Sequence, residues 1–375
     1  MKILVFDKFL GYQVGGAQSS LHYLLKNLKG DFEFFGCEVK EAFGADKYKI
    51  DANILMNTND TNRGIERISI RECPRFPYFE YWLNRKKIQK FIAGQKADLL
   101  MAQGLWGAIA INSFRGRTIY FIRDEYHFNK IPVYQTGFKK FFKKIYLLSQ
   151  WPFIRQIFQD NKKAIEKADI VMANSEFIAN QISKIFKKET EFIYPLIDVG
   201  SLIKTEIPPV TKRFFITSIG PELIKGGLIV EKLAKIMPEH RFMIVGRNFN
   251  KPVWKDNILY YPWVKDSLEI YEKTKILLVP SICNDAWAAG ATKAWALGTP
   301  ALGSKRGGIS EVLEEEFLID DIWDIKKWKD KIIEIEKNYE KYPELLKQKA
   351  LKFDAKEQIE RFKKIIKEKL NIEVK

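Results

Sequence analysis

The pattern that most constrains this chain is a buried strand followed by a glycine turn and a helix, which opens both halves of the sequence. In the first half, "KILVF" (2–6) precedes the pair Gly15-Gly16 and an apolar-periodic segment. In the second half, "RFFITSIG" (213–220) precedes "LIKGGLIVEKLAKIM" (223–237). A strand that feeds a helix through a glycine turn begins a doubly wound α/β unit. The sequence therefore predicts two such units.

Further predicted strands end in polar or charged residues. They are "ADLLMAQ" (97–103), "TIYFIRD" (118–124) and "ADIVMANS" (168–175). Ligands of open α/β sheets bind beyond the carboxyl ends of the strands, so these ends are candidate binding positions.

The length of 375 residues suits two domains of ordinary size. The stretch 194–214 holds three prolines and no clear periodicity, and we interpret it as the interdomain linker. We expect one domain over 1–195, a second over 196–350, and a charged amphipathic helix in 351–375.

Composition limits the possible partners and surroundings of the chain. The net charge of +16 favours an anionic partner, with solvated lysine faces as the alternative. Zinc-finger spacing, an RNP-like strand and an obvious helix-turn-helix are absent, so we expect no nucleic-acid binding. Three scattered cysteines make no disulfide framework, and the sequence contains no signal peptide and no apolar run of about 18–20 residues. We expect a cytoplasmic protein.

A set of motifs in chain order resembles the GT-B retaining glycosyltransferases of the family-4 type, also called glycosyltransferase group 1. Gly15-Gly16 comes first, and the more specific motifs lie in the second half. These are "GPELIKGG" (220–227), "RFMIVG" (241–246), "VPS" (279–281), "DAWAAGATKAWALGTPALGS" (285–304) and "RGGISE" (306–311).

The resemblance implies two Rossmann-like domains facing a cleft, with the last helix crossing back to the N-terminal domain. It also implies transfer of a sugar from a nucleoside-diphosphate donor, with retention of anomeric configuration and without a metal or other cofactor. The donor would lie mostly on the C-terminal domain and the glycan or lipid-linked acceptor mostly on the N-terminal domain.

Several residues are candidates for donor binding. The resemblance makes Lys225 the phosphate-binding lysine, with an exposed helix-start lysine as the alternative. Glycine turns at Gly15-Gly16 and Gly307-Gly308 would let backbone amides approach a ligand, or they are ordinary turns. Glu311 is either a donor-site residue or a first-turn acid favoured by the helix dipole. Trp263 is either near the nucleobase or a packed core aromatic.

The helix after "VPS" departs from the family pattern of two glutamates separated by seven residues. Asp285 takes the first position, where the acid would lie near the donor sugar; its alternative is a helix N-cap. Lys293 takes the second, where a glutamate would bind the ribose, and an ammonium cannot accept hydrogen bonds. Lys293 could instead donate to a ribose oxygen, pair with Asp285, bind a phosphate, or be a solvated surface lysine.

A second departure lies at the end of "TIYFIRD". The family often carries a histidine here facing the donor sugar, whereas this chain has Arg123-Asp124. The pair could bind donor or acceptor hydroxyls and phosphate, the arginine bidentately, or form a structural ion pair. We expect Asp285, Arg123 and Asp124 to act on the sugar.

Residues 137–158 place aromatic and aliphatic side chains at helical spacing, with lysines between them. Such a helix can lie on the anionic inner face of a membrane, or it can pack on its domain with a solvated lysine face. The resemblance thus implies a retaining glycosyltransferase of cell-surface polysaccharide or glycolipid assembly. The alternative is a non-catalytic GT-B protein that binds a glycan or scaffolds a glycan-assembly complex.

Overall fold

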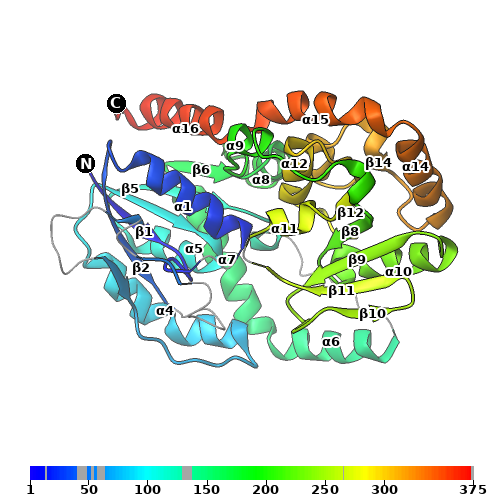
Figure 1. Ribbon diagram of the computed structural model, residues 1–375. Coiled ribbons are helices and arrows are strands. Elements are labelled where there is room, and N and C mark those ends of the chain that lie inside the picture. Colours follow the sequence, from blue (N-terminus) through cyan, green and yellow to red (C-terminus); the bar gives the residue numbers. More distant parts are fainter. Residues whose placement is uncertain are drawn as a thin grey trace. The chain divides into compact units, whose positions relative to one another are not determined.

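A computed structural model describes residues 1–12, 15–39, 49–51, 55–56, 64–128, 137–264 and 266–372. The chain divides into two compact units (Figure 1). The first comprises Met1–Leu196 and Gln358–Lys375, and the second Ile197–Glu357. The division, between Leu196 and Ile197, falls inside the predicted linker 194–214. The rest of that linker belongs to the second unit and contains helix α9 (Val199–Ile203).

The first unit is built on a parallel sheet with strand order β3-β2-β1-β4-β5-β6-β7 in the described residues. Phe6 at the end of β1 is in register with Cys37 of β2 and Ala102 of β4. The strands are mostly apolar along their whole length because helices cover both faces of such a sheet. They are β1 (Lys2–Phe6), β2 (Glu33–Glu38), β3 (Ile65–Arg67), β4 (Leu99–Gln103), β5 (Arg117–Ile122), β6 (Ile170–Ala173) and β7 (Glu191–Phe192).

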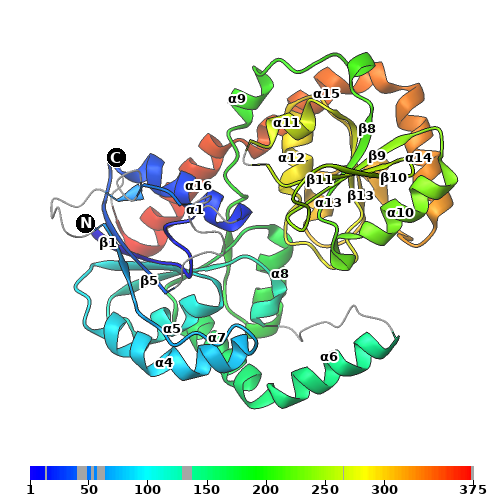
Figure 2. The ribbon, with the colours of Figure 1, turned by 60° about the horizontal axis from the view of Figure 1, so that its bottom comes forward.

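Helices cover the two faces of this sheet. Helices α4, α5 and α7 lie on one face, and α1 and α16 on the other (Figure 2). The helices with residues in this unit are α1 (Gly16–Leu28), α4 (Pro77–Ala93), α5 (Gly104–Ser113), α6 (Gly137–Ser149), α7 (Trp151–Lys167), α8 (Glu176–Phe186) and α16 (Ala355–Leu370).

Helix α16 returns to the first unit, as predicted. Its Phe362 ring stacks on Phe121 of β5 at 6.1 Å between centroids. Lys363 pairs with Asp31 at 3.2 Å, and Arg117 Nη1 donates to the Leu370 carbonyl at 2.5 Å. Apolar packing and end-on polar contacts therefore hold this helix against the first sheet.

The basic segment 137–158 forms two helices rather than one. Helix α6 ends at Ser149 and α7 begins at Trp151. Pro152 lies in the first turn of α7, where its missing N–H is not needed, but a helix running on through it would lose a hydrogen bond. Within the described residues, no helix is both long and apolar enough to span a bilayer.

The second unit is built on a sheet with order β10-β11-β9-β8-β12-β13-β14, parallel except for the edge strand β10. The crossovers from β8 to β9 and from β12 to β13 run in opposite directions, so their helices α10 and α12 cover opposite faces. The strands are β8 (Phe215–Ile219), β9 (Arg241–Gly246), β10 (Val253–Lys255), β11 (Ile258–Pro262), β12 (Thr274–Val279), β13 (Ala301–Ser304) and β14 (Leu318–Ile319). The remaining helices are α10 (Gly227–Ile236), α11 (Leu268–Tyr271), α12 (Ala289–Ala296), α13 (Ile309–Val312), α14 (Ile325–Lys337) and α15 (Tyr342–Ala350).

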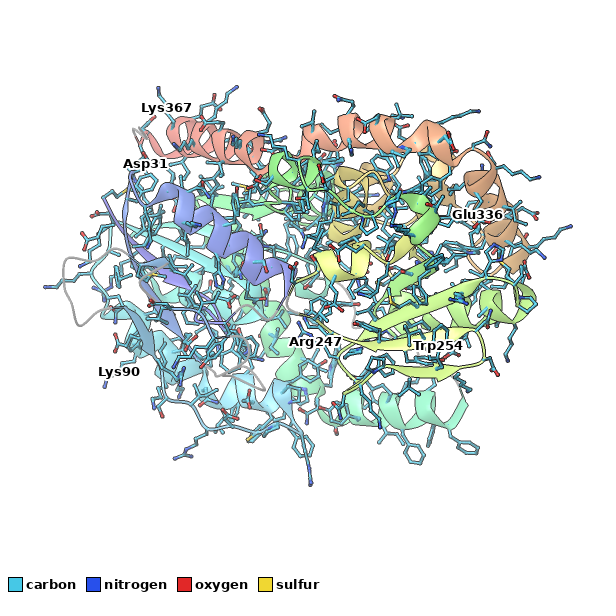
Figure 3. The ribbon with its side chains drawn as sticks, viewed as in Figure 1. Asp31, Lys90, Arg247, Trp254, Glu336 and Lys367 are labelled. Carbon is cyan, nitrogen blue, oxygen red and sulfur yellow. The ribbon has the colours of Figure 1, made fainter. Side chains whose placement is uncertain are left out.

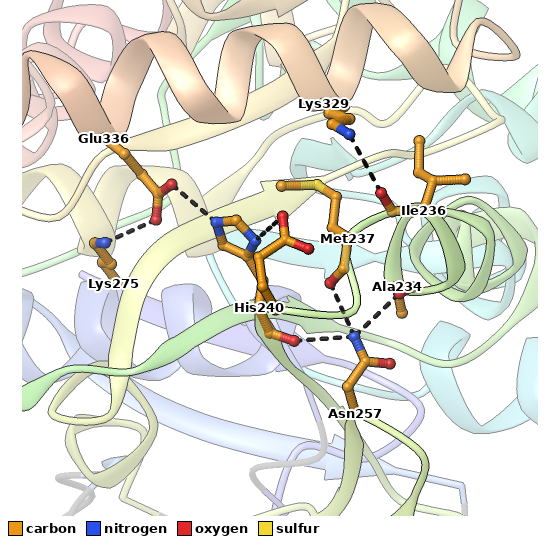
Figure 4. A network of polar contacts seen from close by, with 9 residues as sticks. Ala234, Ile236, Met237, His240, Asn257, Lys275, Lys329 and Glu336 are labelled. Atoms are coloured by element: carbon orange, nitrogen blue, oxygen red, sulfur yellow. Dashed lines mark hydrogen bonds and ion pairs between the residues drawn. The ribbon is translucent and has the colours of Figure 1, made fainter.

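A polar network closes the amino end of the second sheet (Figure 4). The Asn257 amide donates to the carbonyls of Ala234, Met237 and His240, which satisfies the end of α10. His240 bonds Glu336 of α14 at 2.9 Å, and Glu336 also accepts from Lys275 at 2.7 Å. This end of the sheet is closed by structural contacts, so the carboxyl end is the candidate for ligand binding.

Candidate functional site

The predicted donor-site residues lie around the carboxyl end of the second sheet. Strand β8 has β9 on one side and β12 on the other, so the strand order reverses between β8 and β12. The loops that follow these two strands carry Lys225 and Asp285. A reversal of strand order is where open α/β sheets leave a crevice for a ligand.

Lys225 and Asp285 form an ion pair at this position. Lys225 Nζ lies 2.5 Å from Asp285 Oδ1, with the lysine side chain 39% exposed and the aspartate 15%. Ser281 Oγ donates to the second oxygen, Oδ2, at 2.5 Å. Both carboxylate oxygens are therefore engaged, and Asp285 holds the ammonium at the edge of the sheet while leaving it accessible to an anion.

Glycines bring the two loops together. Gly226 has φ +80°, and a Cβ on it would lie 2.0 Å from the carbonyl oxygen of Pro280. A backbone hydrogen bond of 2.9 Å from Ile282 N to Ile224 O joins the same loops. This contact requires glycine, since any side chain at 226 would overlap the backbone of the neighbouring loop. The loop packing thus places Lys225 beside Asp285.

Asp285 is not a helix N-cap, contrary to the alternative considered from the sequence. Helix α12 begins at Ala289, and its N-cap residue is Ala288 without a side-chain hydrogen bond. The residues between Asp285 and the helix form an irregular loop. The carboxylate is instead directed to Lys225 and Ser281.

The Gly307-Gly308 turn packs on the backbone of Asp285. Gly307 has φ +57°, and a Cβ on it would lie 2.4 Å from the Asp285 carbonyl oxygen. The Gly308 amide donates to that same oxygen at 2.7 Å. The Gly308 N–H is therefore bonded to the Asp285 carbonyl and is not available to a ligand, so the expectation of a ligand contact by this amide is wrong for Gly308. Glu311 is half-buried in the short helix α13, and its amide bonds the Gly308 carbonyl.

Lys293 is half-buried on α12, which contradicts the alternative of a solvated lysine. Its Nζ donates to Ser267 Oγ at 3.3 Å, and it does not pair with Asp285, whose carboxylate contacts Lys225. Burial lowers the pKa of Lys293, and the charge of Asp266 opposes this. A partly desolvated ammonium with one weak hydrogen bond is suited to meet a polar or anionic group.

Trp263 follows β11 at the same edge. It is half-buried and packs with Val264 against a core cluster of Met243, Val245, Leu259 and Ile270. The Arg247 guanidinium, labelled in Figure 3, lies over its ring at 5.2 Å. Trp263 therefore packs on the core, as one of the two interpretations expected, but it is only partly buried.

Gly15-Gly16 opens α1 of the first unit. Gly15 is the N-cap residue, without a side-chain cap. A Cβ on Gly16 would meet no described atom within 4 Å, and on Gly15 the nearest is Gln18 Oε1 at 3.5 Å. Packing among the described residues therefore does not require glycine at either position.

Arg123 and Asp124 follow β5 and make different contacts. Asp124 Oδ1 accepts from the Tyr126 amide at 2.9 Å and caps the turn Glu125–His127. Arg123 is buried, and its Nε donates to Gln103 Oε1 at 3.3 Å. Burial lowers the pKa of Arg123 to about 10, and Asp7 partly offsets this effect.

Several residues of these two edges were not singled out from the sequence. In the second unit they are Ser281 and Arg306, whose Nη1 donates to the Ile282 carbonyl at 2.9 Å. In the first unit they are Asp7, Gln103 and Asn174, which lie at or just past the carboxyl ends of strands. The rule that ligands bind beyond strand ends had already marked the segments that hold Gln103 and Asn174, and applied to "KILVF" (2–6) it would have added Asp7.

Comparison with known proteins supports the predicted resemblance. Residues 233–353 match the family model "Glycosyl transferases group 1". This range includes Asp285, Lys293, Gly307, Gly308 and Glu311 but not Lys225. No curated protein sequence matches the chain.

Solved structures share the fold over nearly the whole chain. One is Anabaena Alr3699/HepE in complex with UDP-glucose, at 14% identity and TM-score 0.69, covering 98% of this chain and 100% of that one. A sucrose-phosphate synthase from Thermosynechococcus elongatus has 14% identity and TM-score 0.68, covering 98% of each chain. The lipopolysaccharide outer core galactosyltransferase WaaB has 14% identity and TM-score 0.59, covering 96% and 98%. These matches confirm the prediction of two Rossmann-like units of the GT-B type.

Proposed function

We propose that this chain, whose residues 233–353 match the group 1 glycosyl transferases, is a retaining glycosyltransferase with a nucleoside-diphosphate sugar as donor. The observation that carries the proposal is Lys225, held by Asp285 at the strand-order reversal of the second sheet. A half-exposed ammonium at such a crevice suits a diphosphate.

Lys225 would act on the leaving group. When the bond between the sugar and the diphosphate breaks, negative charge grows on the phosphate oxygens, and a prepositioned cation stabilises it. We propose that Lys225 supplies this charge without a metal. The diphosphate would share the ammonium with Asp285, which makes Asp285 a positioning residue for Lys225. Retention would follow from attack of the acceptor hydroxyl on the face from which the phosphate departs.

A donor screen tests the proposal. The purified full-length chain is incubated with each common nucleotide-sugar, and released nucleoside diphosphate is measured. Release from at least one donor is expected, with water as the acceptor, and NMR recorded before the released sugar mutarotates should show the anomeric configuration of that donor. The non-catalytic alternative is tested by titrating UDP and GDP by calorimetry. Binding of neither nucleotide and release from no donor would rule out the proposed function.

We propose a glycan or lipid-linked acceptor of cell-surface polysaccharide or glycolipid assembly. The fold shared with a lipopolysaccharide outer core galactosyltransferase supports this acceptor class. The first unit adds an exposed apolar and basic helix. Phe138 of α6 is 85% exposed and Leu148 72%, and Phe141, Phe142 and Ile145 are also exposed. With Lys140, Lys143 and Lys144 on the same helix, we propose that α6 lies on the anionic inner face of a membrane.

Replacing Phe141 and Phe142 together by serine should weaken binding to phosphatidylglycerol vesicles. Each ring buried in the interface contributes about 1.5–3 kcal/mol, so removing both should lower the partition coefficient by about 100-fold or more. Vesicle co-sedimentation measures the partition coefficient. The same measurement with uncharged phosphatidylcholine vesicles shows how much of the binding depends on the anionic lipid. Trp323→Ser, at an exposed aromatic of the second unit, is the matched control. Equal partition of wild type and the double variant would show that α6 does not dock on lipid.

Lys293→Glu should tighten nucleotide binding. A carboxylate at this position can accept hydrogen bonds from two ribose hydroxyls, whereas the ammonium only donates. We expect about tenfold stronger UDP binding by calorimetry, the effect of one hydrogen bond to a charged group. Lys305→Glu, an exposed charge reversal after β13, controls for the general loss of positive charge. Unchanged affinity in Lys293→Glu would place Lys293 away from the ribose.

A further inference from the structure

Four neighbouring strands of the first sheet each place a polar residue at the same carboxyl edge. Gln103 ends β4, and Asp7, Arg123 and Asn174 directly follow β1, β5 and β6. These strands are adjacent in the order β1-β4-β5-β6, and all are parallel. All four side chains are buried. The strand order of this sheet also reverses between β1 and β4, so the row lies at the crevice position of the first unit.

Asp7 accepts three hydrogen bonds, all of them from neutral donors. Oδ1 accepts from the Phe9 amide at 2.8 Å and from Gln18 Nε2 at 3.3 Å. Oδ2 accepts from Gln103 Nε2 at 2.7 Å. Gln103 therefore lies between Asp7 and Arg123, and its Oε1 accepts a hydrogen bond from Arg123 Nε at 3.3 Å.

Arg123 is left with most of its donors available. The residue is 9% exposed, and its guanidinium lies over the Phe121 ring at 5.0 Å. Within the described part of the chain, only Nε of the guanidinium makes a hydrogen bond. In these described residues the two terminal nitrogens, which carry four N–H groups, have no hydrogen-bond partner. A buried cation without a direct counter-ion is costly, so a group that supplies negative charge there would bind favourably.

Asn174 offers an acceptor next to this cation. Its Nδ2 donates to the Arg123 carbonyl at 3.2 Å, which ties the two residues together. Its Oδ1 is buried and has no hydrogen-bond partner in the described structure. A ligand that satisfies both residues carries an oxyanion, which accepts from the Arg123 guanidinium, and a hydroxyl, which donates to Asn174 Oδ1.

We propose that Arg123 and Asn174, positioned by Gln103 and Asp7, form a subsite for a sugar that bears a carboxylate or a phosphate group. The inference deepens the proposed function and rests on it, because it names the chemical class of sugar that the proposed enzyme takes. The anion would bind the two terminal nitrogens of Arg123 bidentately, and a sugar hydroxyl would donate to Asn174 Oδ1. A neutral sugar would leave the buried guanidinium without compensation.

Titration of the full-length chain with three small sugars tests the proposal. The probes are D-glucuronate for the carboxylate, D-glucose 6-phosphate for the phosphate, and D-glucose as the neutral comparison. Calorimetry of the wild type should show binding of at least one anionic probe about tenfold or more tighter than D-glucose. Whichever anionic probe binds more tightly identifies the group. Equal binding of all three, or binding of none, would overturn the proposal.

Two variants locate the subsite. Arg123→Gln should lower affinity for the anionic probe to that of D-glucose, and Arg123→Lys should retain part of it because the charge remains without the fork. Arg115→Gln is the matched control, because Arg115 is exposed and precedes the same strand, β5, at its other end. Unchanged anion affinity in Arg123→Gln, or equal losses in Arg115→Gln, would overturn the proposal.

UDP titration of the same proteins separates this test from that of the proposed function. Lys225 and Asp285, the residues proposed to act on the diphosphate, belong to the second unit, so UDP binding by the wild type tests the proposed function without reference to Arg123. Intact UDP binding with no anion preference would reject the subsite alone. Anion binding without any response to UDP or GDP and without donor release would reject the glycosyltransferase proposal alone.

Discussion

Lys225→Ala should lower turnover with any accepted nucleotide-sugar by about 10²- to 10³-fold, the effect of removing one prepositioned electrostatic stabiliser from a developing oxyanion. The variant should remain folded, because the ion pair of Lys225 with Asp285 is partly solvated. Exposed pairs of this kind contribute at most about 1 kcal/mol to folding. Steady-state kinetics of nucleoside diphosphate release measure the loss.

Two further variants show how the lysine acts. Lys235→Ala removes an exposed lysine of α10 and should leave turnover unchanged. Asp285→Asn keeps the ammonium but weakens the contact that orients it, so its loss should be smaller than that of Lys225→Ala. If Lys225→Ala turns over an accepted donor at the wild-type rate, the assigned role of Lys225 is wrong.

Arg85→Ala should destabilise the first unit by about 3–5 kcal/mol, the usual result of leaving a buried carboxylate without its cation. Arg85 binds Asp160 with two hydrogen bonds, at 2.6 Å from Nε and 2.7 Å from Nη2. Asp160 is 0% exposed and also accepts from Tyr81 and Gln156. These contacts join α4 to α7, so their loss should lower the urea midpoint of the unfolding transition of this unit.

Matched variants separate charge from packing. The double variant Arg85→Ala/Asp160→Asn has no buried unpaired carboxylate, so its free energy of unfolding should recover much of what Arg85→Ala loses. Lys162→Ala, in an exposed pair with Glu166 on α7, should change stability by less than about 0.5 kcal/mol. A loss in Arg85→Ala no larger than that in Lys162→Ala would show that Asp160 does not need its cation.

The sequence alone predicted the architecture because local patterns encode it. Continuous apolar runs such as "KILVF" are typical of strands buried on both faces, and the glycine turns mark where helices begin. The resemblance added the return of α16 and the importance of the 285–304 stretch. The length of the basic helix was wrong, because the proline in the first turn of α7 separates it from α6.

The partners of the site residues were decided by tertiary structure. Lys225 and Asp285 are far apart in the chain, and they meet because Gly226 permits contact with the Pro280 backbone. The spacing of Asp285 and Lys293 suggested that the two could pair, yet each has a different partner.

The same holds at the first sheet. The sequence placed Arg123 at a strand end, beside an aspartate with which it could alternatively form an ion pair. Sheet register instead brings Gln103 and Asn174 from neighbouring strands to Arg123. Local sequence determines where strands end, since backbone preference and apolar patterning act over a few residues. Which polar groups then meet depends on strand order and register, which only the folded chain establishes.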